Sequence, residues 1–201
     1  MIKVSVIIPM YNAEDTIENT IRSIPKRDDV EIIVIDDGST DKSAMKVAAT
    51  MISRAGQPRQ LFSKKNGGVA SAINKGLELA EGEYVVFLGS DDDFYTEEFE
   101  KAMLELDGTD LVYFNLRINS GEVWEVNKDT KGNLCGSVKF MRREFIGDTR
   151  ENEMMKTGED YYFYLDLLAK KPTEKYTGLT VKHYNFPREG SLSWKRRVGE
   201  L

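Results

Sequence analysis

The stretch VSVIIPMYN, at residues 4–12, decides the fold of this chain. Its first five residues form a short, nearly continuous apolar run, as expected of a β-strand that is covered on both faces. The stretch IIVI, at residues 32–35, is a second run of the same kind. Buried strands of this type occur mainly in α/β proteins, so the two runs predict an open, mostly parallel sheet flanked by helices.

Strand-like and helix-like patterns alternate through residue 115, as an α/β fold requires. Ile17 and Ile21 have helical spacing, and Pro25 ends that helix. Asn12 is predicted to cap the same helix, and Thr96 to cap a later one. The predicted strands lie at 4–8, 32–35, 60–62, 84–88 and 111–114, with helices after residues 12, 40, 68 and 96.

The pattern changes after residue 115, where residues 117–133 are polar and rich in Gly and Asn. The elements predicted beyond residue 115 are a hairpin strand at 123–126, a short helix at 137–147 with Phe140 and Phe145 facing the core, an apolar helix at 161–169 and a strand at 180–186. We find no internal repeat and expect a single domain, residues 1–201, with a small C-terminal subregion.

The composition is that of an ordinary globular protein, with 201 residues, a net charge of −6 and 40% hydrophobic residues. Cys135 is the single cysteine, which excludes an intrachain disulfide and favours a reducing compartment. The acidic balance argues against nucleic-acid binding. No apolar run approaches the ~18 residues of a transmembrane helix, and the opening residues lack a secretory cleavage pattern.

Polar clusters directly follow three of the predicted strands. Tyr11 follows the first strand, Asp36 and Asp37 follow the second, and Asp91 and Asp92 follow the fourth. Ligands of open parallel sheets bind at the carboxyl ends of the strands, so we expect these clusters on one rim. The last pair could hold Mg²⁺ or Mn²⁺, although a solvated acidic turn is the simpler interpretation of that cluster taken alone.

Each of the other candidates also has a structural alternative. Tyr11 could stack on a flat base or pack on the first helix. The Asp36–Asp37 pair could accept hydrogen bonds from a base or ribose, or close a turn around Gly38. The stretch Asn66-Gly67-Gly68 could present backbone N–H groups to a phosphate, or form a tight turn.

Three candidates lie in the last part of the chain. Asp160, preceded by Glu159, could be a general base or could stabilise the first turn of the following helix. His183 could contact a metal or diphosphate, but a partly buried strand histidine is the simpler interpretation. Lys195-Arg196-Arg197 could clamp a diphosphate or touch an anionic membrane, or be a frayed tail.

These motifs together resemble one known family. The stretches that carry the resemblance are VSVIIPMYN (4–12), VIDDGSTD (34–41), NGG (66–68), NKG (74–76), AEGEY (80–84) and FLGSDD (87–92), followed by GEDY (158–161). Taken in this order, they resemble a family 2 inverting glycosyltransferase. The resemblance implies the GT-A fold, a Rossmann-like nucleotide-binding domain, and transfer of a sugar from a nucleotide-sugar donor. The donor of such enzymes is usually a UDP-sugar with Mg²⁺ or Mn²⁺ on the diphosphate.

The resemblance also implies roles for individual residues. The nucleotide would be held by Pro9, Tyr11, Asp36, Asp37, Asn66 and Asp91. Within that set, Asp37 would accept the imide N–H of the base, with support from Asp36. Asp91 and Asp92 would serve the ribose and the metal, in place of the DXD motif of the family. Asp160 would deprotonate the acceptor hydroxyl for inverting attack.

One departure from the family motif affects the metal. Gly89 stands where the commonest motif has its first Asp, so a metal would depend on Asp91 and Asp92. A nucleotide-binding GT-A-like module without transferase activity is therefore the alternative function. A signalling receiver domain leaves Tyr11 and the second acidic cluster without a role. A nucleotidyltransferase would want a Gly-rich basic loop where residues 9–12 stand.

The resemblance implies partners as well. Residues 1–115 would bind the nucleotide-sugar, and residues 116–201 would face the acceptor, a sugar or a lipid-linked sugar. Nucleic acid is not expected as a partner. Nucleotide-sugars are made in the cytoplasm, so we expect a cytoplasmic enzyme of polysaccharide assembly. Peripheral contact with the inner face of the membrane could run through the basic tail at 195–197.

Overall fold

The computed structural model describes residues 1–130, 137–155, 157–187 and 189. Its strands are β1 (Val4–Met10), β2 (Val30–Asp36), β3 (Arg59–Ser63), β4 (Tyr84–Phe87), β5 (Asp93–Phe94), β6 (Leu111–Ile118), β7 (Val123–Trp124), β8 (Lys139–Arg142) and β9 (Glu174–Tyr184). Its helices are α1 (Ile17–Ser23), α2 (Ser43–Ile52), α3 (Val69–Leu79), α4 (Thr96–Met103), α5 (Arg143–Ile146) and α6 (Glu159–Ala169). Cys135 and residues 195–197 lie outside the described residues.

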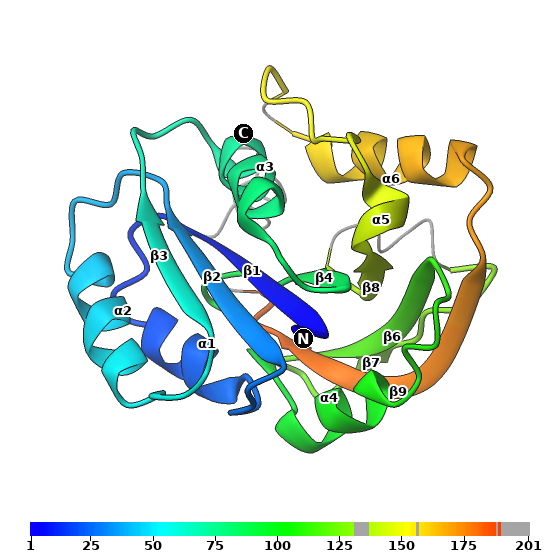
Figure 1. Ribbon diagram of the computed structural model, residues 1–201, viewed down its shortest axis with the longest axis horizontal. Helices are drawn as coiled ribbons and strands as arrows, with labels where there is room; N and C mark the ends of the chain where they lie inside the picture. The colour runs from blue at the N-terminus through cyan, green and yellow to red at the C-terminus, as the bar shows by residue number, and fades with distance from the viewer. Residues whose placement is uncertain (131–136, 156, 188, 190–201) are drawn as a thin grey trace.

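One sheet forms the centre of the molecule, in the order β3-β2-β1-β4-β8-β6-β9-β5, with β7 paired to β6. The first four strands of that order are mutually parallel. All seven residues of β2 are buried, which agrees with the two-sided cover expected from its apolar run. Helices α3 and α6 lie on one side of the sheet, and α1, α2 and α4 on the other (Figure 1). The predicted α/β architecture is confirmed.

The other half of the sheet is mixed, because β8 inserts between β4 and β6 and runs antiparallel to both. The predicted helix at 137–147 is therefore wrong for its first half, and only residues 143–146 are helical. Phe140 is fully buried, but as a strand residue. Strand β8 fills the gap between two sheet edges, and the backbone hydrogen bonds gained there outweigh local helical spacing.

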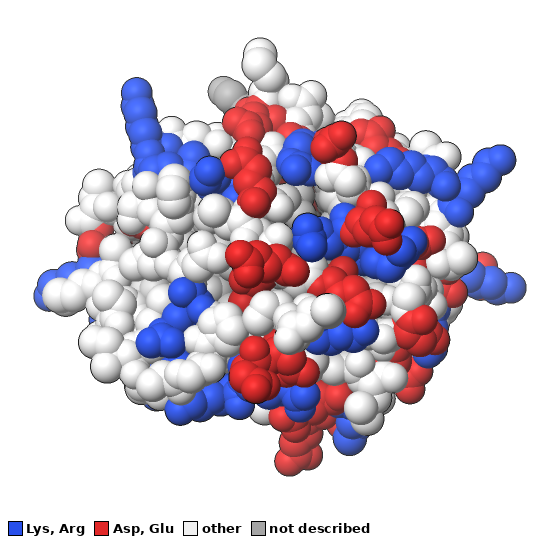
Figure 2. All heavy atoms as spheres, in the orientation of Figure 1, with Lys and Arg blue, Asp and Glu red and all other residues white. Residues whose placement is uncertain are grey.

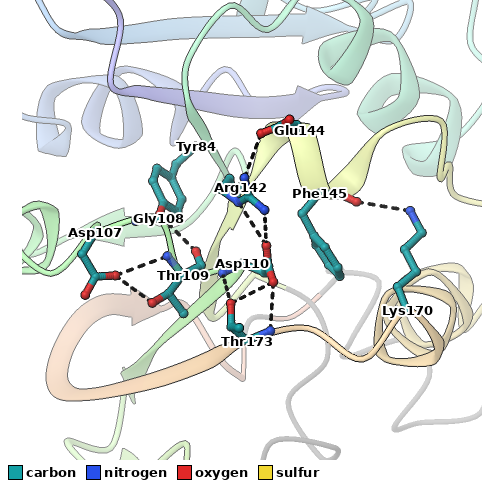
Figure 3. Close-up of polar contacts among 10 residues, drawn as sticks. All are labelled: Tyr84, Asp107, Gly108, Thr109, Asp110, Arg142, Glu144, Phe145, Lys170 and Thr173. Carbon is teal, nitrogen blue, oxygen red and sulfur yellow. Dashed lines mark hydrogen bonds and ion pairs between the residues drawn. The ribbon is translucent and has the colours of Figure 1, made fainter.

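A buried carboxylate joins the starts of β6 and β9 to the end of β8 (Figure 3). Arg142 donates to Asp110 Oδ1 through Nε and Nη2, at 3.0 and 2.6 Å. Thr173 donates to Asp110 Oδ2 through its backbone N–H and its hydroxyl, at 2.9 and 2.8 Å. Burial alone would raise the pKa of Asp110, but these donors outweigh burial and hold the pKa below its ordinary value.

Neither predicted helix cap is found in the structure. Asn12 lies well before α1 begins, with a positive φ of 48°, and its side-chain oxygen accepts the N–H of Thr40 at 2.8 Å. Thr96 is the first residue of α4, and its hydroxyl donates to the carbonyl of Ser23. Both side chains connect separate segments, because tertiary partners are within reach where a local cap was expected.

Acidic and basic side chains alternate over the face drawn in Figure 2, with the acidic ones gathered in a band down its middle. The described part of that face therefore does not present the continuous basic surface that favours nucleic acid. None of the described helices is long and apolar enough to cross a membrane.

Candidate functional site

The loops after β1, β2, β3 and β4 meet on one rim of the sheet. Backbone N–H groups of Asp37 and Lys64 donate to carbonyls at the ends of neighbouring strands, those of Met10 and Asp36. Thr16 directly precedes α1 and Thr20 lies within it. The hydroxyls of both residues donate to the carbonyl of Ser90, at 2.8 and 3.1 Å. The prediction that the three polar clusters share one rim is confirmed.

Asp37 organises the loop that precedes α3. Its Oδ1 accepts the Lys64 ammonium at 2.6 Å and the Gly67 N–H at 3.0 Å, and its Oδ2 accepts the Gly68 N–H at 2.8 Å. The two glycine N–H groups therefore donate to a carboxylate of the same chain, where a phosphate was considered. Asn66 beside them is exposed on the rim. Lys64 was missed, although its place just after a predicted strand could have revealed it.

Asp36 and Gly38 shape the turn after β2. Asp36 is buried and accepts the Ser39 N–H at 2.9 Å and the Ser63 hydroxyl at 3.2 Å. Gly38 has a φ of +81°, and a Cβ there would lie 2.9 Å from the backbone nitrogen of Asn66. A glycine is required for both reasons, since other residues rarely adopt that φ and the neighbouring loop comes too close.

Tyr11 presents an open aromatic ring on the rim. Its side chain is 52% exposed, directly after β1 ends. Pro9, two residues earlier, is partly buried and lies opposite Ile35 of β2. The structure thus places an accessible flat ring next to the Asp36–Asp37 turn, and such a ring can stack on a base.

The acidic cluster after β4 is divided among different partners. Asp91 is partly exposed, whereas Asp92 is buried. The Asp92 Oδ2 lies 2.7 Å from the Lys182 ammonium, and its Oδ1 accepts the Asn185 N–H at 2.9 Å. Asp93 Oδ2 lies 3.8 Å from His183 Nδ1. His183 is a partly exposed residue of β9, which agrees with the simpler of its two interpretations. Lys182 was missed, although a lysine within the apolar stretch 180–186 was a visible signal.

These residues fit a divalent cation only in part. Among the described residues, no group of three or more His, Cys, Asp or Glu side chains gathers as a metal site. Asp91 fits, because Mg²⁺ can be held by one carboxylate together with substrate phosphates and water. Asp92 fits poorly, because its side chain is buried and its charge is compensated by the buried Lys182 ammonium. Gly89 allows that arrangement, since a Cβ there would lie 2.8 Å from Asp92 Oδ2 and 3.1 Å from Asp91 Oδ1.

Asp160 lies in the first turn of α6, as predicted, and is partly exposed. Its Oδ1 accepts the Tyr161 N–H at 2.9 Å. The segment leading to α6 is tied to α3, because the Asn74 side chain donates to the Glu151 carbonyl and accepts the Glu151 N–H, both at 2.9 Å. Helix α3 therefore connects the Gly67–Gly68 loop to the Glu151 segment, which precedes α6 in the sequence.

Glu151 was not predicted, and its environment is unusual. Its side chain is buried, and its Oε2 has no hydrogen-bond partner among the described residues. Burial, reinforced by the charges of Glu159 and Asp160 and opposed by Lys139, raises the pKa of Glu151 to about 8. A pKa of about 8 favours the protonated form of Glu151 at neutral pH, and the charge of Asp160 contributes to that shift. Sequence spacing gave no signal for Glu151, because it follows no periodic pattern.

A surface hollow lies at the opposite end of the strands, where β1 and β4 begin. It is lined by Ile2, Glu81, Glu83, Gly108, Arg142 and Arg143 among others. In parallel sheets the ligand rim is at the carboxyl ends, so this hollow is separate from the cluster around Asp37 and Asp91.

Comparison with known proteins finds matches to most of this chain. Residues 5–170 match the family model for glycosyl transferase family 2. An uncharacterized glycosyltransferase of Haemophilus influenzae is 39% identical over 181 residues, which cover 83% of this chain and 72% of that protein. The putative teichuronic acid biosynthesis glycosyltransferase TuaG of Bacillus subtilis is 31% identical over 189 residues, with the same coverage of both chains.

Solved structures show the same fold. TarS 1–349 of S. aureus in complex with UDP-GlcNAc has a TM-score of 0.80 at 24% identity, over 94% of this chain and 60% of that one. The mannosyltransferase PcManGT of Pyrobaculum calidifontis, in complex with GDP-Man and Mn²⁺, has a TM-score of 0.74 at 21% identity, over 98% and 61%. The chain spans about three fifths of both structures, and it belongs to glycosyl transferase family 2, with the GT-A fold.

Proposed function

We propose that this chain transfers a sugar, with inversion, from a UDP-sugar to an acceptor hydroxyl during assembly of a polysaccharide or glycoconjugate. The observation that carries the proposal is the rim itself, where the open Tyr11 ring and the Asp36–Asp37 turn share one edge with Asp91. TarS, whose fold this chain shares, is described in complex with UDP-GlcNAc, and TuaG is named for teichuronic acid biosynthesis.

The donor nucleotide lies across the carboxyl ends of β1, β2 and β4 in this proposal. Tyr11 stacks on the base, with Pro9 beneath the same loop. Asp37 accepts the imide N–H at Oδ2, because a carboxylate oxygen accepts two hydrogen bonds and Gly68 supplies one. Asp36 holds the turn, Asn66 approaches the nucleotide from the β3 loop, and Asp91 faces the ribose and diphosphate.

A divalent cation, Mg²⁺ or Mn²⁺, is part of the proposal with Asp91 as its protein ligand. PcManGT is described with Mn²⁺, which supports a cation in this fold. When bound, such an ion neutralises charge on the diphosphate as the sugar leaves. The family motif would add Asp92 as a second ligand, but Asp92 is already paired with Lys182.

Asp160 is proposed as the base that removes the proton from the acceptor hydroxyl. It is partly exposed at the start of α6, and Glu151, in the segment before that helix, is bonded to Asn74 of α3. Residues 1–115 form the donor part and residues 116–201 the acceptor part. The acceptor is a sugar or a lipid-linked sugar, and the reaction takes place in the cytoplasm, at the inner face of the membrane when the acceptor is lipid-linked.

Substitution of the base separates transfer from donor binding. Asp160→Asn is expected to lower transfer by about 10²-fold or more, because the acceptor hydroxyl loses its base, while UDP affinity stays unchanged. Calorimetry measures UDP affinity, and release of UDP from a panel of UDP-sugars with candidate acceptors measures transfer. Asp166→Asn, in the same helix, is the matched control.

Two outcomes contradict the proposed transferase. If no nucleotide binds, the donor rim is assigned wrongly. If UDP binds but Asp160→Asn transfers sugar as well as the unaltered chain, Asp160 is not the base. UDP binding without transfer to any acceptor favours the second candidate, a nucleotide-binding module, which the pairing of Asp92 with Lys182 also favours.

A further inference from the structure

A buried lysine lies directly beneath the acidic cluster. The Lys182 side chain in β9 is 2% exposed, and its ammonium lies 2.7 Å from Oδ2 of Asp92, whose side chain is 4% exposed. The same ammonium donates to the hydroxyl of Ser137. The other oxygen of Asp92 accepts the backbone N–H of Asn185, three residues farther along the chain. Asp92 is thus bonded to β9 and the residue that follows it through both of its oxygens.

The position of Lys182 in the sheet makes this pair hard to separate. Lys182 lies opposite Leu116 of β6 and Phe94 of β5, in the middle of three paired strands. An ammonium placed there is shielded from solvent, and separating it from Asp92 leaves two buried charges without compensation. The ion pair is therefore expected to persist when a ligand reaches the rim.

Asp92 is a poor ligand for a cation while this pair persists. A carboxylate binds Mg²⁺ or Mn²⁺ through an oxygen lone pair and its negative charge. The charge of Asp92 is compensated by Lys182, and its side chain is only 4% exposed, so a cation at the rim has little access to either oxygen. Of the two neighbouring carboxylates, Asp91 is partly exposed and is therefore the one that a cation can reach. The ammonium also reduces the repulsion that the acidic cluster exerts on a diphosphate.

We propose that the Lys182 ammonium neutralises Asp92 and so prevents Asp92 from serving as a metal ligand. A divalent cation at the rim then has Asp91 and the diphosphate as its ligands, and it adds little to the affinity for a nucleoside diphosphate. Without nucleotide, the protein binds Mn²⁺ weakly. What this inference says about nucleotide affinity rests on the proposed donor site. What it says about Mn²⁺ binding without nucleotide depends on Asp92 and Lys182 alone.

The test measures Mn²⁺ binding by electron paramagnetic resonance, without nucleotide. Lys182→Met frees Asp92, so Mn²⁺ affinity is expected to rise about tenfold or more, and Mn²⁺ is expected to raise the melting temperature of that variant. The double variant Lys182→Met/Asp92→Asn is expected to return to the affinity of the unaltered chain. Lys139→Met is the matched control, since Lys139 is equally buried but packs over the Tyr164 ring.

A second arm uses the unaltered protein and Asp92→Asn, so it does not depend on the folding of Lys182→Met. UDP is titrated calorimetrically with Mn²⁺ and with EDTA. We expect the UDP affinity to differ less than about threefold between Mn²⁺ and EDTA. We also expect Asp92→Asn to leave the Mn²⁺ affinity unchanged. Tight Mn²⁺ binding that Asp92→Asn abolishes would overturn the inference. Failure of UDP to bind would instead overturn the donor site and leave the Mn²⁺ arm to decide on Lys182.

Discussion

Tyr11 shows how a single residue can be tested against the donor site. Tyr11→Ala removes the open ring and is expected to weaken UDP binding by about 1–3 kcal/mol, or roughly 5- to 150-fold, because one base loses its stacking partner. Calorimetric titration with UDP measures the loss. Tyr162→Ala is the control, since Tyr162 is equally exposed but lies on α6. An unchanged affinity in Tyr11→Ala would place the base elsewhere.

Glu151 gives the protein a predictable pH dependence. Its pKa in the folded protein, about 8, lies above the ordinary value of 4.5. As the pH rises through this window, the unfolded chain gives up the proton and the folded chain keeps it, so the free energy of unfolding falls between pH 4.5 and about 8. The contribution of Glu151 to the free energy of unfolding is fully present below pH 4.5.

Glu151→Gln is therefore expected to flatten the decline and to raise stability at pH 8, by about 1.4 kcal/mol for each unit by which the pKa is shifted. Urea unfolding at several pH values measures the change. Glu153→Gln, an exposed neighbour, is the control and should leave the pH profile in place. A parallel profile for Glu151→Gln and the unaltered chain would mean that Glu151 titrates normally.

The turn between β2 and α2 depends on close packing against the β3 loop. Gly38→Ala forces a residue with a Cβ into a φ of +81° and against the Asn66 nitrogen. We expect a loss of about 1–3 kcal/mol in unfolding free energy and weaker UDP binding, because the loop carrying Asn66 must move. Gly56→Ala separates the two effects, since Gly56 also has a positive φ but a Cβ there would meet no described atom within 4 Å.

If Gly38→Ala and Gly56→Ala lose the same stability and bind UDP alike, only backbone strain matters at Gly38. Thermal unfolding and UDP titration of the two variants decide between these outcomes.

The junction of β6, β8 and β9 depends on Asp110. Asp110→Asn removes the charge that Arg142 and Thr173 bind, and the free energy of unfolding is expected to fall by about 1.5–3 kcal/mol. The lowered pKa of Asp110 means that its contribution is present above its ordinary value of 3.8 and is lost as the pH falls toward its folded value. Denaturant unfolding at pH 7 and pH 3 measures both effects.

Asp107→Asn is the control for the Asp110 variant, because Asp107 is exposed, and its ion pair with Lys175 and its hydrogen bonds from Thr109 compete with water. Equal stability of Asp110→Asn and Asp107→Asn at pH 7 would show that the junction does not depend on the buried carboxylate.

At the scale of the whole molecule, the rim joins segments that are distant in sequence. The Lys182–Asp92 pair connects residues 90 positions apart, and Asn74 binds Glu151 across 77 positions. The first pair ties β9 to the loop after β4, and the second ties α3 to the segment before α6. Separate long-range side-chain bonds therefore fix the loop after β4 and the segment that precedes the helix carrying Asp160.

The sequence by itself determined the parallel half of the sheet, the common rim of its polar clusters and the helix that begins beside Asp160. These features follow from local patterns, since apolar runs specify buried strands and strand polarity places their ends together. Only the tertiary structure decided that residues 139–142 form a strand, that Asp37 binds Lys64, Gly67 and Gly68, and that Asp92 pairs with Lys182. Each of these depends on partners brought together by folding, which no local spacing encodes.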